Sequence, residues 1–331
     1  MPTTQKHTAI IDLAIARDEA ARYPLVASWQ RSRVLYDLNP NKLSAPERVT
    51  QQELHEAQDR LGLLLNLSKA KLDQLYLAVG DVGCSVVLAD KNGVAIARRG
   101  AEVDDQTFDE WGLWTGAIWS EESEGTNGIG TCIIEKRPLT IHKDQHFHSK
   151  NTGLSCTAAP IFDHKANLMA VIDVSSCRAD LTANFSQLIS VAVVDTARRI
   201  ETDHFSQSFP DAQIILASMP NSAEGSNNTV KGAALIAVDQ DDLVIGATRA
   251  ARAVYGLTDD DLAGPLPLSA LRGKAVDLAR DYALSEKRVI QQSLAKSGGN
   301  ISAAAREMGI SRATLHRKLK KFNAFAAEFT K

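Results

Sequence analysis

The sequence GNISAAAREMGISRATLHRKLKKF, residues 299–322, contains the signals that specify how the C-terminal part of this chain folds. Asn300 and Ser311 are residue types that cap helix N-termini, and Gly309 between them is a residue type that ends a helix. Immediately upstream, residues 285–297 form a helical pattern that begins at Ser285 and stops at a glycine pair. The spacing therefore predicts three short helices, the last two joined by a tight turn.

The last of these helices has two unlike faces. At 100° per residue, Leu315, Leu319 and Phe322 share one side, whereas the opposite side is cationic, with five Lys or Arg and no acid over residues 312–322. Such a helix suits the DNA major groove, where Arg317 can bond guanine edges and Thr314 can contact thymine methyls or phosphate. The remaining cations would position the helix on the phosphate backbone. The predicted DNA-contacting residues are Ser311, Arg312, Ala313, Thr314, His316, Arg317, Lys318, Lys320 and Lys321.

The distribution of charge also favours a nucleic acid partner. The chain of 331 residues has a formal net charge of −3, but residues 285–331 hold ten Lys or Arg and three Glu, a net charge of +7. The first 284 residues therefore carry −10, and a basic end on an acidic body is typical of phosphate binding. Two alternatives are a merely solvated basic helix and a small basic bundle that contacts proteins.

Residues 299–322 resemble the Fis-type helix-turn-helix at the end of bacterial enhancer-binding regulators. That resemblance implies double-stranded DNA as a partner and dimerisation through residues 285–297. A homodimer fits the physics, because one short recognition helix gives little affinity and two half-sites about one helical turn apart restore it.

The body of the chain divides at changes of pattern. Residues 1–80 read as an N-terminal helical region, and residues 81–205 as a domain of strands that starts with a hairpin at Asn92-Gly93 and closes with a long helix. Residues 206–231 read as a linker with an apolar patch, 232–273 as a short sheet-containing segment, and 280–325 as the helix-turn-helix domain. The predicted class is α+β with an all-α C-terminal domain.

The segment WGLWTGAIWSEESEGTNGIGT, residues 111–131, and the strands around it resemble the GAF-type sensor domain of acetoin-catabolism regulators. Residues 232–258 further resemble the PAS-like segment of the same family, here truncated. The resemblance implies a small effector such as acetoin, a diol or another alcohol. Candidate contacts are Trp111, Trp114, Trp119, Glu124, Thr126, Asn127, His146, Cys156 and Asp173. Alternatively, the tryptophans belong to the core and the turn at Thr126-Asn127 only caps a helix.

Other chemistries are weaker predictions. His142, His146 and His148 lie at spacings seen in metal sites, but the strand-like residues 138–142 argue against a helix that would bring them together. A haem or iron centre bound by a histidine or cysteine, and a redox role for Cys156, also stay open. An enzyme would need a nucleophile with its base, or a metal, and no Ser-His-Asp, HExxH or CxxC pattern is present. We therefore expect no catalytic residues, no metal and no cofactor.

Full-length members of the resembled family carry an ATPase module between sensor and helix-turn-helix, which needs a GxxxxGK[ST] phosphate loop. That pattern does not occur in this sequence. We expect a DNA-binding regulator that is not a sigma-54 ATPase, with RNA polymerase as a further candidate partner. The alternative is a non-ATPase co-regulator of full-length sigma-54 activators. No run of 18 apolar residues, no signal peptide and no close cysteine pairs occur, so the expected location is the cytoplasm, on the nucleoid.

Overall fold

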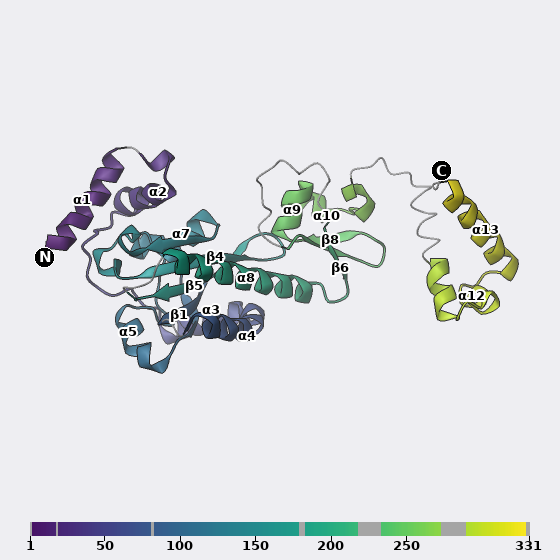
Figure 1. Cartoon of the computed structure of the whole chain (residues 1–331), viewed down its shortest axis with the longest axis horizontal. Helices are drawn as coiled ribbons and strands as arrows, with labels where there is room; N and C mark the ends of the chain where they lie inside the picture. Colours follow the sequence, from purple (N-terminus) through teal and green to yellow (C-terminus); the bar gives the residue numbers. More distant parts are fainter. Residues whose placement is uncertain are drawn as a thin grey trace. The chain divides into compact units, whose positions relative to one another are not determined.

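The computed structural model describes residues 2–17, 19–80, 83–178, 183–217, 233–272 and 289–328. The chain divides into two compact units, residues 1–265 and residues 266–331. Figure 1 shows the elements of both units in chain order. Ser285, at which the first of the three predicted C-terminal helices begins, lies outside the described residues.

A five-stranded antiparallel sheet organises the first unit, in the order β2-β1-β5-β4-β3. Its strands are β1 (Cys84–Asp90), β2 (Ala95–Arg99), β3 (Leu139–His142), β4 (Ser155–Phe162) and β5 (Leu168–Ser176). The predicted β1–β2 hairpin turns at Gly93, whose φ of +84° suits a residue without a side chain. Strands β1 and β4 are buried along their whole length because both faces of the sheet are covered.

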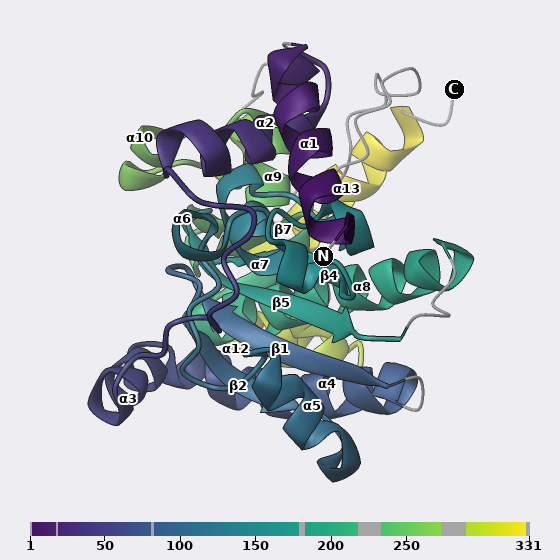
Figure 2. The same ribbon diagram turned by 90° about the vertical axis from the view of Figure 1, so that its left-hand side faces the viewer.

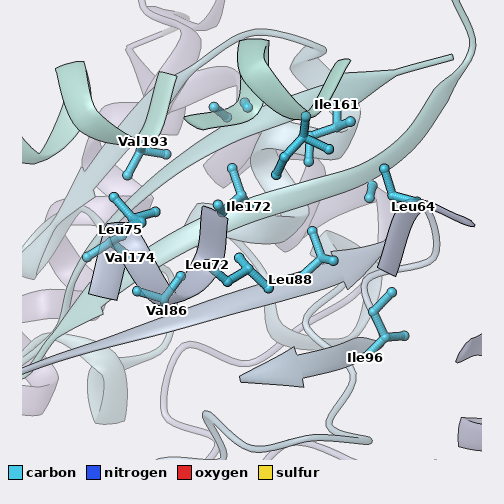
Figure 3. Packing of buried hydrophobic residues seen from close by; sticks show 14 of the residues in the cluster. Leu64, Leu72, Leu75, Val86, Leu88, Ile96, Ile161, Ile172, Val174 and Val193 are labelled. Atoms are coloured by element: carbon cyan, nitrogen blue, oxygen red, sulfur yellow. The ribbon is translucent and has the colours of Figure 1, made fainter. Parts of the chain in front are cut away.

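Helices α4 (Gly62–Val79) and α8 (Ala183–Ser208) cover one face of this sheet. Leu72 of α4 and Val193 of α8 meet the inward side chains of β1 and β5, as Figure 3 shows for the labelled residues. Alternation along β1 directs Val86 and Leu88 to this side. Burying each such aliphatic side chain contributes roughly 1.5–3 kcal/mol, so this layer is a main source of the unit's stability.

The opposite face of the sheet is covered by short helices and loops. These are α5 (Asp105–Glu110), α6 (Glu121–Glu124) and α7 (Gly128–Glu135), with the tryptophan-rich loop between α5 and α6. Phe108, Trp119 and Ile129 pack here against Val87 and Ala89 of β1. The same face also carries the polar side chains of β4 and β5, as described below.

The first two helices of the chain pack onto this second layer. They are α1 (Pro2–Ala16) and α2 (Pro24–Gln30), which continues in a π-helical turn over Arg31–Leu35. Helix α3 (Gln51–Arg60) instead packs through Leu54 and Ala57 into the core on the side of α4 and α8. Ile11, Val26 and Trp29 form a small core with Phe147. Figure 2 shows α1 and α2 on the same side of the sheet as α7. The first helices therefore form a roof over the loops around residues 120–150.

A small sheet follows α8, in the order β6-β7-β8. Its strands are β6 (Gln213–Leu216), β7 (Leu235–Val238) and β8 (Val244–Ala247), followed by α9 (Arg249–Tyr255) and α10 (Asp259–Ala263). The prediction that residues 206–231 are only a linker is wrong for 213–216, because the apolar patch there pairs with β7 in register. Phe205 of α8 packs against Leu235 of β7, so this sheet is joined to the end of α8.

The second unit contains the C-terminal helices. Residues 289–296 are helical and are followed by α12 (Ile301–Glu307) and α13 (Arg312–Glu328). Ile290, Ala304, Ala305 and Leu315 are buried together, with Leu294 and Leu319 packed around them. Among the described residues, no helix has the length and apolar character needed to cross a bilayer.

Candidate sensor site and nucleic-acid interface

A row of polar side chains is buried between the sheet and its roof. Asp173 and Ser175 point to this side of β5, because they alternate with Ile172 and Val174, which belong to the opposite core. Cys156 of β4 lies directly opposite Ser175 in the strand register. These side chains, together with His146, are almost inaccessible to solvent and form one connected group.

Polar contacts connect the four side chains of this group in a row that runs from His146 to Asp173. His146 Nδ1 lies 3.0 Å from the Lys143 carbonyl oxygen, and its Nε2 lies 3.3 Å from Cys156 Sγ. Ser175 Oγ is 3.1 Å from Cys156 Sγ and donates to Asp173 Oδ2 at 2.5 Å. Burial lowers the pKa of His146 to about 4, so the imidazole is neutral. Its Nδ1–H donates a hydrogen bond to the Lys143 carbonyl, and its Nε2 accepts a hydrogen bond from the Cys156 thiol.

Asp173 retains an unused acceptor. Its Oδ1 is buried and has no hydrogen-bond partner within the described ranges. Burial raises the pKa of this carboxyl to about 7, against a weaker opposing effect of the Ser175 hydrogen bond. A Cβ at Gly128 would lie 2.6 Å from Oδ1, so only glycine permits this close approach. A buried carboxyl with a free oxygen is suited to accept a hydrogen bond from the hydroxyl group of a small molecule.

Three other predicted contacts use their polar atoms within the protein. The Glu124 carboxylate is buried and lies 2.7 Å from Lys150 Nζ and 3.4 Å from Lys42 Nζ. Thr126 Oγ1 lies 2.7 Å from Ser28 Oγ of α2. Asn127 caps α7, accepting from the Gly130 amide at 2.8 Å, which is the alternative that the sequence left open for this turn.

The three tryptophans are buried to different depths, and two of them, Trp111 and Trp119, belong to the cluster that contains Cys156. Trp119 is buried, and its indole N–H donates to the Gly112 carbonyl at 2.8 Å. Trp114 is half-buried beneath the guanidinium of Arg98, 4.4 Å from the ring centre. Trp111 is half-buried against the same core. Trp119 therefore has the features of a core residue.

Buried polar contacts hold the roof in place. The Arg31 guanidinium donates to the buried Glu121 carboxylate from Nε at 2.5 Å and reaches Glu135 at 3.2 Å. Ser28 Oγ donates to Glu121 Oε2 at 2.7 Å, and the Trp29 indole donates to the Gln145 carbonyl at 2.8 Å. Sequence reasoning missed Ser28, Arg31 and Glu121, because no pattern pairs residues about 90 positions apart. It also missed Ser175, which alternation from Asp173 would have placed on the same face.

The metal and redox alternatives find little geometric support. Across the described ranges, no three His, Cys, Asp or Glu side chains are grouped as metal ligands. His142 ends strand β3, and its Nδ1 lies 2.9 Å from Ser155 Oγ. Burial raises the pKa of the Cys156 thiol well above its usual value, which opposes the thiolate that a redox switch needs.

The C-terminal helices present the predicted cationic face. Asn300 Oδ1 accepts from the amides of Ser302 and Ala303, and Ser311 Oγ accepts from the Thr314 amide at 3.1 Å. Gly309 has a φ of +64° in the turn between α12 and α13. Both predicted caps and the glycine turn are confirmed. This geometry fixes the start of α13 relative to the helix behind it.

The predicted DNA-contacting side chains of α13 lie mainly in solvent. Leu315 is buried and Leu319 half-buried on the inner face, as predicted. Thr314 Oγ1 lies 2.8 Å from Ser311 Oγ and 3.4 Å from Arg317 Nη2, which gathers three predicted contacts at the helix start. The exposed residues are Ser311, Arg312, Ala313, His316, Arg317 and Lys320, whereas Thr314 and Lys318 are half-buried. The side chain of Lys321 lies outside the described residues.

Two sequence families match this chain. The family described as MimR, N-terminal domain, matches residues 5–201, which is more than half of the chain. The family described as bacterial regulatory protein, Fis family, matches residues 283–322. The second match coincides with the helix-turn-helix and confirms that prediction.

Relatives among curated proteins are transcriptional regulators by name. The acetoin catabolism regulatory protein of Cupriavidus necator is 31% identical over 202 residues, 61% of this chain and 30% of that protein. The acetoin dehydrogenase operon transcriptional activator AcoR of Bacillus subtilis is 30% identical over 48% of this chain and 26% of its own. The propane 2-monooxygenase operon transcriptional activator MimR of Mycolicibacterium smegmatis is 29% identical over 49% of this chain and 26% of its own. The match thus spans less than a third of each relative, and the predicted resemblance to acetoin-catabolism regulators is confirmed.

One solved structure has a comparable fold. The crystal structure of the E. coli DhaR(N)–DhaL complex aligns over 80% of this chain and 86% of that chain, with a TM-score of 0.50 and 18% identity. At this identity the likeness concerns the fold alone. It confirms the predicted α+β class for the sensor region.

Proposed function

This chain belongs to the family of the MimR N-terminal domain, and from that membership we propose that it is a sequence-specific DNA-binding regulator of transcription that senses a small molecule. The observation that carries the proposal is the Fis-family segment, folded as a helix-turn-helix with an exposed cationic face on α13. Its curated relatives are also named as regulators of transcription. The proposed role of this chain is therefore not enzymatic.

In the proposed complex, α13 lies in the major groove with its N-terminal residues at the base edges. Arg317 is exposed six residues after the Ser311 cap, where a bidentate bond to a guanine is sterically open. Arg312 and Lys320 would neutralise phosphates on either side. A homodimer would present two such helices, and the half-exposed Val289 on the preceding helix is a candidate apolar contact between the subunits.

A gel-shift experiment with sheared DNA from the native chromosome tests DNA binding. The double variant Arg317→Ala/Lys320→Ala should raise Kd at least tenfold and flatten its salt dependence, since it removes one base contact and one phosphate contact. The control Lys91→Ala/Lys165→Ala removes two exposed charges from turns of the sensor domain and should leave Kd unchanged. Equal loss in both variants, or no salt-sensitive shift of any fragment by the wild type, would contradict the proposal.

For the effector we propose a small neutral molecule with a hydroxyl group, bound at Asp173. Two relatives are named for acetoin, which has a hydroxyl donor and a carbonyl acceptor. The free Asp173 Oδ1 supplies the matching acceptor, and Trp111, Trp119 and Ile129 supply apolar surface. Acetoin, diols and other alcohols remain the candidate effectors.

Calorimetric titration with acetoin and 2,3-butanediol tests this assignment. Asp173→Asn should weaken binding about tenfold or more, because an amide replaces one acceptor and rearranges the bond to Ser175. Thr140→Ala is the matched control and should bind as the wild type does, because Thr140 lies on β3, which β4 separates from β5, and its hydroxyl pairs with that of Thr157. If the wild type and both variants bind with the same affinity, Asp173 does not contact the effector and this assignment is wrong.

The way in which transcription is affected is also a proposal. Since the chain has no GxxxxGK[ST] loop, it would act without its own ATP hydrolysis, through RNA polymerase or by occupying a promoter in the cytoplasm. The alternative is a co-regulator that pairs with full-length sigma-54 activators. Retained DNA binding by the purified homodimer favours the first role, and binding only after a full-length activator is added favours the second.

A further inference from the structure

A cavity of about 350 Å³ lies where α8 leaves the five-stranded sheet and meets the small sheet. Its walls come from the end of β4, the middle and C-terminal half of α8 and the start of α9. Figure 1 shows α8 extending from the large sheet towards β6 and β8. The cavity is separate from the Asp173 group, because none of His146, Cys156, Asp173 and Ser175 lines it.

The interior wall of the cavity is hydrocarbon. It is lined by Ala159, Pro160 and Phe162 at the end of β4 and by Val194 and Ala197 of α8, and Phe205 lies at the base of the small sheet. Pro160, Phe162, Ala197 and Phe205 are all buried by the surrounding chain. A volume of this size falls within the range of small-molecule sites, and an apolar body would be desolvated against this wall.

Positive charge dominates the polar part of the cavity. Four basic side chains line it, and only two acidic ones do; they are Lys136, Arg137, Arg198, Arg249, Asp163 and Glu201. The Arg249 guanidinium lies 4.1 Å from the centre of the Phe162 ring and donates to the Lys136 carbonyl, which leaves further N–H donors. Arg198 Nε is buried and has no hydrogen-bond partner within the described ranges.

Glu201 does not cancel this charge. Its Oε1 accepts from the Phe162 amide at 2.8 Å, and burial raises the pKa of this carboxyl to about 7, opposed by that hydrogen bond and by Arg249 and Arg198. Near pH 7 a substantial fraction of Glu201 is therefore protonated. The four basic side chains outweigh Asp163 and Glu201, so the cavity carries a net positive charge.

We propose that this cavity is a second ligand site, for a small organic carboxylate with a hydrocarbon body. The carboxylate would lie between Arg198 and Arg249, where charge-assisted bonds are strong, and the body would lie against Pro160, Phe162 and Val194. One wall belongs to the sensor domain and the other to the β6–β8 segment. The ligand would therefore bridge the two parts and stabilise their contact.

Calorimetric titration of the full chain with hexanoate tests this site, with 1-hexanol and inorganic phosphate as comparison probes. Wild-type protein should bind hexanoate at least tenfold more tightly than either probe, because the site needs both a charge and an apolar body. Affinity for hexanoate should rise as the pH falls from 8 to 6, since protonation of Glu201 removes a negative charge among Arg198, Arg249, Lys136, Arg137 and Asp163.

Variants locate the binding. Arg249→Gln and Arg198→Gln should each weaken hexanoate binding about tenfold or more, and Ala250→Phe should block the cavity. Arg199→Gln is the matched control, because Arg199 is the next residue of α8, is exposed and pairs with Asp195 outside the cavity. Arg249 is also exposed, so its variant tests the site without disturbing the core.

Three outcomes would overturn the proposal. They are no hexanoate binding by the wild type, equal affinity for hexanoate and 1-hexanol, and equal loss in Arg249→Gln and Arg199→Gln. Asp173→Asn should leave hexanoate binding unchanged. The two ligand sites can therefore fail independently.

Discussion

Replacing Asp173 by Asn should change how the stability of the sensor domain depends on pH. The carboxyl is buried, and its pKa in the folded chain is about 7, raised from an ordinary value of 3.8. A carboxyl whose pKa is raised by folding binds its proton more tightly in the folded state. The free energy of unfolding therefore falls as the pH rises from about 4 to about 7. In the Asn variant, which has no carboxyl at this position, this fall is absent.

The size of the effect follows from the two pKa values. With 1.36 kcal/mol per unit of pKa, the raised pKa of Asp173 lowers the free energy of unfolding by roughly 2 kcal/mol at pH 5.5 and about 4 kcal/mol at pH 8. Asp173→Asn should therefore gain about 2 kcal/mol in free energy of unfolding, relative to the wild type, when the pH is raised from 5.5 to 8. Asp173 is fully buried, so solvent screening does not reduce this figure appreciably.

Urea unfolding followed by tryptophan fluorescence at the two pH values measures the difference, because Trp119 is buried in the same layer. Val174→Ala is the control: it shortens the neighbouring side chain, faces the opposite core and carries no titratable group. Its destabilisation should be the same at both pH values. A wild-type-to-Asn difference that stays constant within about 0.5 kcal/mol would show that Asp173 is not shifted, and the reasoning from its burial would fail.

Three further predictions concern packing and charge. Gly128→Ala should abolish measurable acetoin binding in calorimetry, because its Cβ would lie 2.6 Å from Asp173 Oδ1; wild-type affinity would contradict the close approach. Arg31→Met should lower the free energy of unfolding by about 3 kcal/mol in urea titrations, because the buried Glu121 carboxylate loses its partner, and adding Glu121→Gln should recover part of this loss. Leu315→Ala should destabilise the C-terminal helices by about 2–5 kcal/mol, seen in thermal melts, and abolish the gel shift while acetoin binding persists.

Local signals in the sequence were sufficient for the C-terminal helices. Asn300, Gly309 and Ser311 each act within three or four residues of their own position, so capping and turn chemistry predict the observed helix boundaries. The turn at Asn92-Gly93 predicted the hairpin of β1 and β2 in the same way. The strand β6 was missed because four residues with one apolar patch carry too little periodicity to separate a strand from a linker.

The sensor site depends on contacts that are distant in sequence, and only part of it was predictable. Cys156 and Asp173 were singled out, but their connection through Ser175 requires the register between β4 and β5. The roof is harder still, since the pairing of Arg31 with Glu121 joins helices 90 residues apart. Residue type indicates which side chains need a partner, whereas only the folded chain determines which partner they find.

The roof has a practical consequence for anyone who prepares shortened versions of this protein. A fragment that starts at α3, near residue 51, would contain the complete large sheet with α3 and α4 and would lack α1 and α2. It would leave Glu121 without Arg31, Glu124 without Lys42, and Phe147 bare to water. Expression trials of the isolated sensor should therefore retain the residues from about 5 onwards, and poor solubility of shorter fragments would be the expected sign of the missing cover.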